Sequence, residues 1–139
     1  VMGGLSQGKM ILNADDNGLF KGYVTTENNG GFSSVRYAFG KKKVSKYDQV
    51  VLRVKGDGKT YQFRIKSDAA QRYSYIQSFG TSGNWQTIKL PFESFYPGFR
   101  GNKLDRPNYR GGVMEEIAFL IGNNRNENFS LEIEKIYLE

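Results

Sequence analysis

The chain has 139 residues, of which 38% are hydrophobic and 14% aromatic, and this composition predicts one packed domain rather than a disordered chain. It contains no cysteine and no histidine, which excludes disulfides, thiolate metal sites and every Ser-His or Cys-His catalytic arrangement. The formal net charge of +6 leaves anionic surfaces open as partners.

Nearly the whole chain is typical of β-structure. Nine segments rich in Val, Ile, Tyr, Phe and Thr are bounded by Gly, Asn, Asp or Pro, and no window of helical length has a 3.6-residue period. The predicted strands lie near residues 10–13, 19–28, 32–39, 49–56, 60–67, 73–79, 85–91, 115–121 and 129–138. The pattern predicts an all-β jelly-roll sandwich of about nine antiparallel strands, as a single domain over residues 1–139.

Two glycine-rich segments near the N-terminus imitate ligand-binding loops. Gly3–Lys9 has phosphate-loop spacing, but Met10 stands where a hydroxyl belongs and a strand follows where the motif needs a helix. Asn13–Gly18 resembles the start of a calcium loop, but Val24 replaces the bidentate glutamate. Both segments are interpreted as turns, although calcium binding by an Asp/Asn loop stays open. No metal and no cofactor is predicted.

An arginine lies in the middle of the third predicted strand. The segment Asn28–Gly31 predicts a tight turn, because Asn and Gly tolerate positive φ. The strand that follows places Arg36 on the face opposite Val35, Tyr37 and Phe39.

The middle of the chain predicts a hairpin and a long loop. Asp57-Gly58 favours a primed hairpin turn between the strands at 49–56 and 60–67. Trp85 is expected in the core, and residues 92–112 are expected to form one long loop. The unbroken apolar run 117–121 predicts a strand that is covered on both faces.

The charged residues give weaker signals. Lys41–Lys43 with Lys46 predict a solvated turn, with a weak contact to an anionic surface as the alternative. The acidic doublets are Asp15-Asp16 and Glu115-Glu116. Adjacent residues of a strand point to opposite faces, so a doublet does not by itself make a catalytic pair. The sequence argues against nucleic-acid binding, which needs exposed aromatic residues interleaved with basic ones on one face.

A polar stripe on the sheet faces is the best candidate site. Its predicted ligand-binding residues are Arg36, Arg53, Gln62, Arg64 and Tyr75, with Arg100 added from the long loop. Arginine and glutamine beside an aromatic ring suit sugars, carboxylates or a polar protein surface. The alternative, weighed equally, is the ordinary wet outer face of an antiparallel sheet.

Several blocks, in the same order along nearly the whole chain, resemble the complex I intermediate-associated protein 30 family. The blocks are Val1–Gly4 with Ser6 and Gly8, Glu27–Arg36, Tyr61–Arg64, Trp85 with Pro91-Phe92, Phe95–Gly101 and Phe119–Asn123. The resemblance implies a galactose-binding-like β-sandwich similar to certain carbohydrate-binding modules, and a non-enzymatic role in assembling respiratory complex I. The family domain has a strand-forming segment before the Val1–Gly4 block, so the chain is expected to lack a short N-terminal segment. Ala118 stands where the family has glycine.

We therefore expect a non-catalytic binding module, with two alternatives for its ligand. The leading hypothesis is a chaperone-like assembly factor that binds a protein partner, such as a respiratory-complex subunit, with Phe95, Tyr96, Phe99 and Arg100 as anchors. The second is a carbohydrate-binding module with Tyr75 as stacking platform for a polysaccharide. An enzyme using carboxylates alone is a weaker third. No transmembrane segment is predicted, and a bacterial cytoplasm is favoured over export although the compartment is open.

Overall fold

The computed structural model describes residues 7–26 and 31–139, and within them almost every element is a β-strand. Residues 28–30 of the turn expected at Asn28–Gly31 lie outside the described residues, as do Val1–Gly4 and Ser6 of the first family block. One 3₁₀ helix, η2, covers Phe92–Ser94. The strands are β1 (Gln7–Leu12), β2 (Gly18–Val24), β3 (Ser33–Lys43), β4 (Gln49–Lys55), β5 (Thr60–Lys66), β6 (Ser74–Gly80), β7 (Trp85–Pro91), β8 (Tyr96–Phe99), β9 (Asn102–Lys103), β10 (Val113–Ile121) and β11 (Glu127–Leu138).

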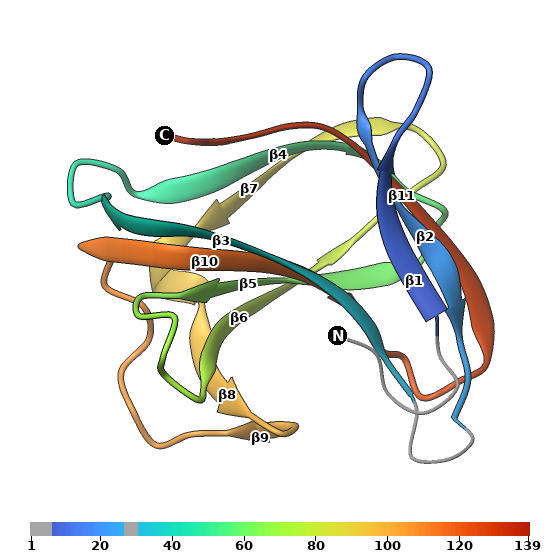
Figure 1. Ribbon diagram of the computed structural model, residues 1–139. Coiled ribbons are helices and arrows are strands. Elements are labelled where there is room, and N and C mark those ends of the chain that lie inside the picture. Colours follow the sequence, from blue (N-terminus) through green and yellow to red (C-terminus); the bar gives the residue numbers. More distant parts are fainter. Residues whose placement is uncertain (1–6, 27–30) are drawn as a thin grey trace.

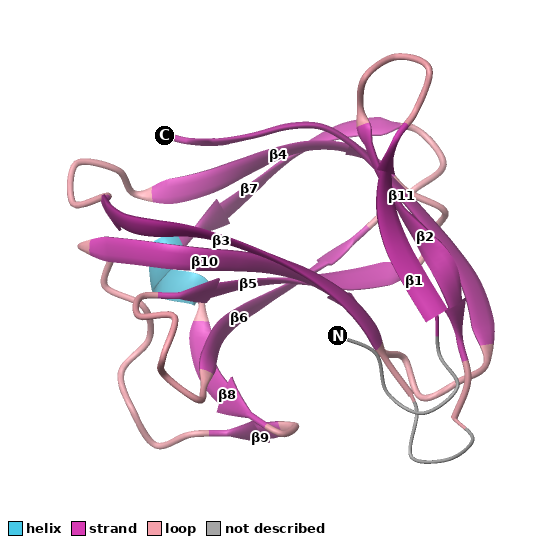
Figure 2. Cartoon of the chain, viewed as in Figure 1, coloured by secondary structure: helices cyan, strands magenta, loops and turns pink. Residues whose placement is uncertain are grey.

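The described strands form two antiparallel sheets that face one another (Figures 1 and 2). One sheet has five strands in the order β1-β2-β11-β4-β7, and the other has six in the order β3-β10-β5-β6-β8-β9. Chain neighbours such as β4 and β5 lie in different sheets, whereas β10 joins β3 to β5 and β11 joins β2 to β4. The predicted jelly-roll sandwich is confirmed.

The core lies between the two sheets and is rich in aromatic rings. Phe63 and Phe119, on neighbouring strands of the six-stranded sheet, have ring centroids 5.2 Å apart. Phe20 and Phe129 make the corresponding contact in the five-stranded sheet at 4.8 Å. Each of these four side chains is at most 4% exposed, so alternate residues of each strand face inward and the residues between them face outward.

The hairpin predicted at Asp57-Gly58 is wrong. β4 pairs with β11 and β7, and β5 pairs with β10 and β6, so the segment between them crosses from one sheet to the other. Asp57 holds this crossover, because its carboxylate accepts hydrogen bonds from the Tyr61 hydroxyl at 3.0 Å and from the Ser130 backbone N–H at 2.8 Å. Asp-Gly favours a turn, but it does not determine which strands pair.

The long loop expected over 92–112 is also partly wrong, because it contains β8 and β9 and extends the six-stranded sheet. Phe95 is fully buried, with its ring centroid 6.2 Å from that of Phe63. It therefore belongs to the core and anchors this segment to the sandwich. Trp85, expected in the core, is only half-buried on the outer face of the five-stranded sheet.

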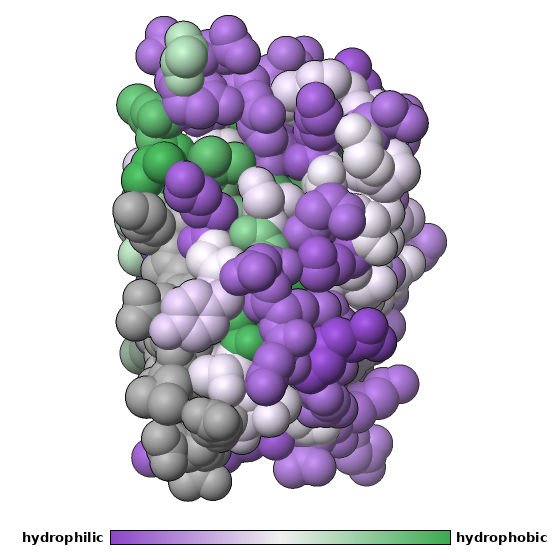
Figure 3. Space-filling view, turned by 90° about the vertical axis from the view of Figure 1, so that its right-hand side faces the viewer, coloured by the Kyte–Doolittle hydropathy of each residue, from purple (hydrophilic) through white to green (hydrophobic). Residues whose placement is uncertain are grey.

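The side of the molecule where β1, β2 and β11 lie is mostly hydrophilic, with apolar atoms gathered at one margin (Figure 3). Across the described residues, no helix is long and apolar enough to span a membrane.

Candidate functional site

The outer face of the six-stranded sheet brings together most of the predicted site residues. The strand register aligns one residue from each of five strands on this face: Arg36, Ala118, Arg64, Ile76 and Tyr96. Two strand spacings of about 4.8 Å separate Arg36 from Arg64, so their backbones lie about 10 Å apart. Gln62 lies on the same face two residues along β5.

Arg64 is the central polar group of this face. Its guanidinium donates two hydrogen bonds to the side-chain oxygen of Gln62, from Nε at 3.0 Å and from Nη2 at 2.7 Å. The side chain is half-buried, and burial lowers the pKa of Arg64, but a guanidinium keeps its charge at neutral pH. Among the described residues, no carboxylate forms an ion pair with Arg64. The site therefore holds a positioned positive charge that is not neutralised within the part of the chain described.

A pocket of about 290 Å³ opens beside this guanidinium. Its lining residues come from β5, β6, β8, β9 and the turn between the last two: Gln62, Arg64, Ile76, Tyr96, Gly98, Phe99, Arg100, Gly101, Asn102 and Lys103. Gly98 lies close to Ile76, because a Cβ at Gly98 would be 2.7 Å from Ile76 Cδ1. The pocket thus gathers three cationic side chains and no carboxylate among its described lining residues.

A tight turn positions Arg100 at the rim of the pocket. Phe99 pairs with Asn102, which leaves Arg100 and Gly101 as a two-residue hairpin turn. Their φ angles are +50° and +80°, and a primed turn with this geometry matches the twist of the flanking strands. Arginine rarely adopts positive φ, so the backbone at Arg100 carries a conformational cost of about 1 kcal/mol.

The aromatic rings at the rim already have cationic partners. The Arg100 guanidinium carbon lies 5.1 Å from the ring centroid of Phe99, and Lys103 Nζ lies 5.8 Å from that of Tyr96. Each ring therefore has one face next to a cation, which leaves less free stacking surface for a neutral ring.

Arg53, also predicted in the stripe, lies on the other sheet. Its strand β4 belongs to the five-stranded sheet, and its side chain is on that sheet's outer face. It donates to Thr87 Oγ1 at 3.3 Å, lies 4.0 Å from a Glu134 oxygen and is 5.7 Å from the Trp85 ring centroid. The prediction that Arg53 converges with Arg36 and Arg64 is wrong.

Tyr75 is likewise separated from Arg64, because it points to the opposite side of β6 from Ile76. Its ring packs against Tyr73 at 5.6 Å and Tyr109 at 5.0 Å. Burial raises the pKa of Tyr75 to about 12, with a hydrogen bond to Tyr73 adding to the shift. Tyr75 therefore belongs to an aromatic cluster at the end of the sandwich and does not face the Arg64 pocket.

The acidic doublets show no shared site. Glu115 lies at a bulge in β10 and accepts a hydrogen bond from the Ala69 backbone, whereas Glu116 pairs across the sheet with Lys66 and Ala38. Asn13 closes the Asp15-Asp16 turn by accepting from the N–H groups of Asp15 and Asn17. Within residues 7–26 and 31–139, no three acidic side chains gather as a metal site would need.

Comparison with protein families identifies the chain. The family model of complex I intermediate-associated protein 30 matches residues 1–133. The chain belongs to this family. A probable complex I intermediate-associated protein 30 of mitochondria from Caenorhabditis elegans is 28% identical over 91% of this chain and 44% of its own length. The Drosophila melanogaster mitochondrial protein of the same name is 23% identical over 98% of this chain and 54% of its own.

These relatives affect the expectations about the function of the chain and about its cellular compartment. The chain spans about half the length of the curated relatives it matches, so what the whole relatives do is carried over to it only as a proposal. Their mitochondrial names disagree with the bacterial cytoplasm favoured from the sequence, and the compartment of this chain stays a prediction.

Solved structures confirm the galactose-binding-like sandwich. A family 11 carbohydrate-binding module from Clostridium thermocellum, determined with a β-1,3-1,4-mixed-linked tetrasaccharide, aligns with a TM-score of 0.69 over 99% of this chain and 85% of its own. The two sequences are 20% identical, so the likeness is one of fold.

Lys103, Asn102 and Ile76 are pocket residues that the sequence prediction did not select. The sequence did contain a signal for Lys103 and Asn102. The segment Phe99-Arg100-Gly101-Asn102 predicts a two-residue hairpin turn when Gly101 is its second turn residue, and the two residues follow that turn. Ile76 had no such signal, because an apolar residue in a strand is normally expected to face the core.

Proposed function

We propose that this domain is a non-catalytic assembly factor that binds a partner protein through the outer face of the six-stranded sheet. The observation that carries the proposal is the half-buried Arg64 guanidinium, which Gln62 orients and which no described carboxylate neutralises. A carboxylate from a partner protein would supply the counter-charge of Arg64, because charge-assisted hydrogen bonds to a fixed guanidinium are strong and directional. Arginine is also among the residues that dominate binding energy at protein interfaces.

The surroundings of Arg64 favour an acidic protein segment as the ligand. Arg36, Arg100 and Lys103 extend the positive charge along the face. Complementary charge accelerates encounter and fixes the register of the partner. The family's name connects its members with complex I, so a subunit of a respiratory complex is the partner class that we propose.

A polysaccharide is the second candidate. Gln62, Asn102 and Tyr96 line the pocket together, and amides beside an aromatic ring can bind sugar hydroxyls. The fold shared with a tetrasaccharide-binding module gives this candidate some support. Two observations weaken it: Tyr75 is absent from this face, and the Tyr96 and Phe99 rings each have a cation on one side.

Affinity capture from a lysate of the host organism tests the proposal. The baits are the wild-type domain, the double variant Arg36→Ala/Arg64→Ala, and Arg53→Ala as the matched control. We expect wild type and Arg53→Ala to enrich the same subunit of a membrane complex. The double variant should lose about 90% of it, because truncating a buried charged contact costs roughly 2 kcal/mol or more.

The melting temperature of the double variant should change by less than about 3 °C, which corresponds to at most about 1 kcal/mol for a domain of this size. Equal recovery on all three baits would contradict the proposal. Retention on a mixed-linkage β-glucan gel that is lost in the double variant would assign the same face to a polysaccharide instead.

A further inference from the structure

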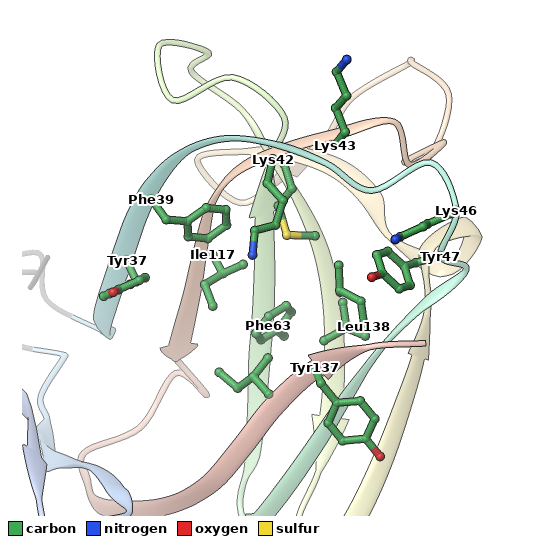
Figure 4. A pocket seen from close by; sticks show the side chains of 13 residues that line it. Tyr37, Phe39, Lys42, Lys43, Lys46, Tyr47, Phe63, Ile117, Tyr137 and Leu138 are labelled. Atoms are coloured by element: carbon green, nitrogen blue, oxygen red, sulfur yellow. The ribbon is translucent and has the colours of Figure 1, made fainter.

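A large hollow lies where the two sheets fail to cover each other. It is a groove of about 690 Å³ between β3 and β10 on one side and the C-terminal part of β11 on the other. Figure 4 shows Phe39, Ile117, Phe63 and Leu138 around this hollow, with Lys42 reaching across its mouth and Lys43 pointing away. The groove therefore exposes part of the hydrophobic core.

The C-terminal part of β11 is much more exposed than β4, the strand that pairs with it in the same sheet. Ile136 and Tyr137 of β11 are 36% and 40% exposed, whereas their register partners Leu52 and Val51 of β4 are both 0% exposed. Ile136 faces the core side of the sheet and Tyr137 the outer side. Side chains on both faces of β11 are thus exposed at this point. The exposure therefore comes from the lack of a neighbouring strand along one edge of β11.

The pairing of β11 explains this exposure. β2 pairs with β11 only from Glu127 to Ile133, whereas β4 pairs with it as far as Leu138. After a bulge at Glu134, the segment Lys135–Leu138 resumes regular pairing with β4. Within residues 7–26 and 31–139, no strand pairs with its other edge. Unpaired N–H and C=O groups along such an edge form a template for another strand.

The opposite wall of the groove is apolar and also partly exposed. Tyr37 lies on the inward side of β3 with Phe39, but it is 67% exposed. β3 is the terminal strand of its sheet, so no described strand lies beyond it. A side chain projecting inward from an added strand would cover Tyr37, Phe39 and Ile117.

The charge around the groove is positive. Lys42 and Lys46 lie at the rim, with Nζ atoms 5.6 Å from the Phe39 ring centroid and 5.4 Å from that of Tyr47. No carboxylate is among the described residues that line the groove. The carboxylates nearest in sequence are Glu134 of β11 and Glu139 directly after it, and they pair with Arg53 and Lys89, respectively.

We propose that the groove binds an extended segment of a partner protein, which adds a strand to β11 along Lys135–Leu138. Its apolar side chains fill the groove at alternate positions, and acidic residues flanking them pair with Lys42 and Lys46. Backbone hydrogen bonds supply affinity in this mode of recognition, and the pockets for alternate side chains supply specificity. The unpaired edge favours a polypeptide over an acyl chain, which has no backbone to pair. The proposal is independent of the Arg64 site.

Selection from a random peptide library displayed on phage, with the wild-type domain as target, provides the probes. We expect enriched peptides that alternate apolar residues and carry Asp or Glu at their ends. Binding should slow hydrogen exchange at the amides of residues 135–138. Methylating alternate backbone nitrogens of a selected peptide should weaken binding by at least about tenfold, because those N–H groups pair with the edge.

Matched variants locate the contact. Tyr37→Glu should weaken binding by about tenfold or more, because it puts a charge into the apolar wall that the segment covers. The double variant Lys42→Glu/Lys46→Glu should have an effect of similar size, because it repels the acidic residues of the segment. The controls are Tyr23→Glu and Lys21→Glu/Lys55→Glu on the five-stranded sheet, which should change affinity by less than about twofold. Arg64→Ala should also bind normally, which separates this proposal from the function proposed above.

Three results would overturn the proposal. One is unchanged binding in both groove variants, and another is full affinity of the methylated peptide. The third is displacement of the peptide by oleate together with unchanged exchange at residues 135–138, which would make the groove an acyl-chain site.

Discussion

Arg53 and Arg64 occupy similar positions on the outer faces of two packed sheets, but their surroundings differ. Arg53 has Glu134, Thr87 and the Trp85 ring as partners from its own chain. Arg64 is oriented by one neutral side chain, Gln62, and its charge has no described carboxylate partner. Mid-strand position on an outer face is therefore insufficient to define a binding residue, and the missing counter-charge distinguishes Arg64.

The first prediction compares the two arginines by removing their charges. Arg64→Met should raise the free energy of unfolding by about 1 kcal/mol, because it replaces a partly desolvated charge with an apolar chain of similar length. Arg53→Met should lower it by about 0.5–1 kcal/mol through loss of the ring contact and the hydrogen bond. Urea unfolding midpoints of both variants and wild type measure this. A destabilised Arg64→Met would show that its guanidinium is a structural group.

The second prediction concerns the turn that carries Arg100. Arg100→Asn should raise the free energy of unfolding by about 0.5–1 kcal/mol, because asparagine tolerates positive φ better than arginine does. If Arg100 belongs to the proposed site, the same change should reduce capture of the proposed partner protein. Thermal unfolding and the capture assay give the two readouts. If the variant is more stable and captures the partner as well as wild type does, Arg100 is not part of the binding site.

The third prediction has the smallest expected effect and concerns Glu132, a carboxylate of the five-stranded sheet that is hydrogen-bonded within the chain. Hydrogen bonds donated by Asn17 at 2.9 Å and Asn13 at 2.7 Å lower the pKa of Glu132. A lowered pKa in the folded state means that this stabilisation is present above the unfolded pKa of about 4.3 and is lost as the pH falls through the folded value. The loss should be below about 0.5 kcal/mol, because solvent screens this side chain.

Urea unfolding of wild type and Glu132→Gln at about pH 6 and pH 3 measures this difference. The variant should lack this part of the acid destabilisation. An identical acid response in both proteins would mean that the two asparagine contacts do not contribute to stability.

The sequence predicted most strands, because inward and outward residues differ in polarity. β4 and β5 alternate clearly, and their observed bounds, Gln49–Lys55 and Thr60–Lys66, agree with the predicted segments to within a residue. β8 and β9 were missed because four-residue and two-residue strands are too short for alternation to be recognised. Their place in the sheet comes from pairing with β6, which is non-local.

The candidate site was only partly predictable for the same reason. Alternation within β3 and β5 correctly placed Arg36 on one face of its strand and Gln62 with Arg64 on one face of theirs. It could not show that β4 lies in the other sheet, or that Tyr75 projects from the opposite face of β6. Whether these residues bind a ligand stays a prediction.

The sequence by itself determined the all-β class, the family and the faces of individual strands, since these depend on residue type and on a local period of two. The tertiary structure decided which strands pair, and hence that Arg36 and Arg64 share a face while Arg53 lies on another. It also decided that β11 has an unpaired edge beside an apolar groove. Pairing and counter-charges join residues far apart in the chain, and no local pattern contains that information.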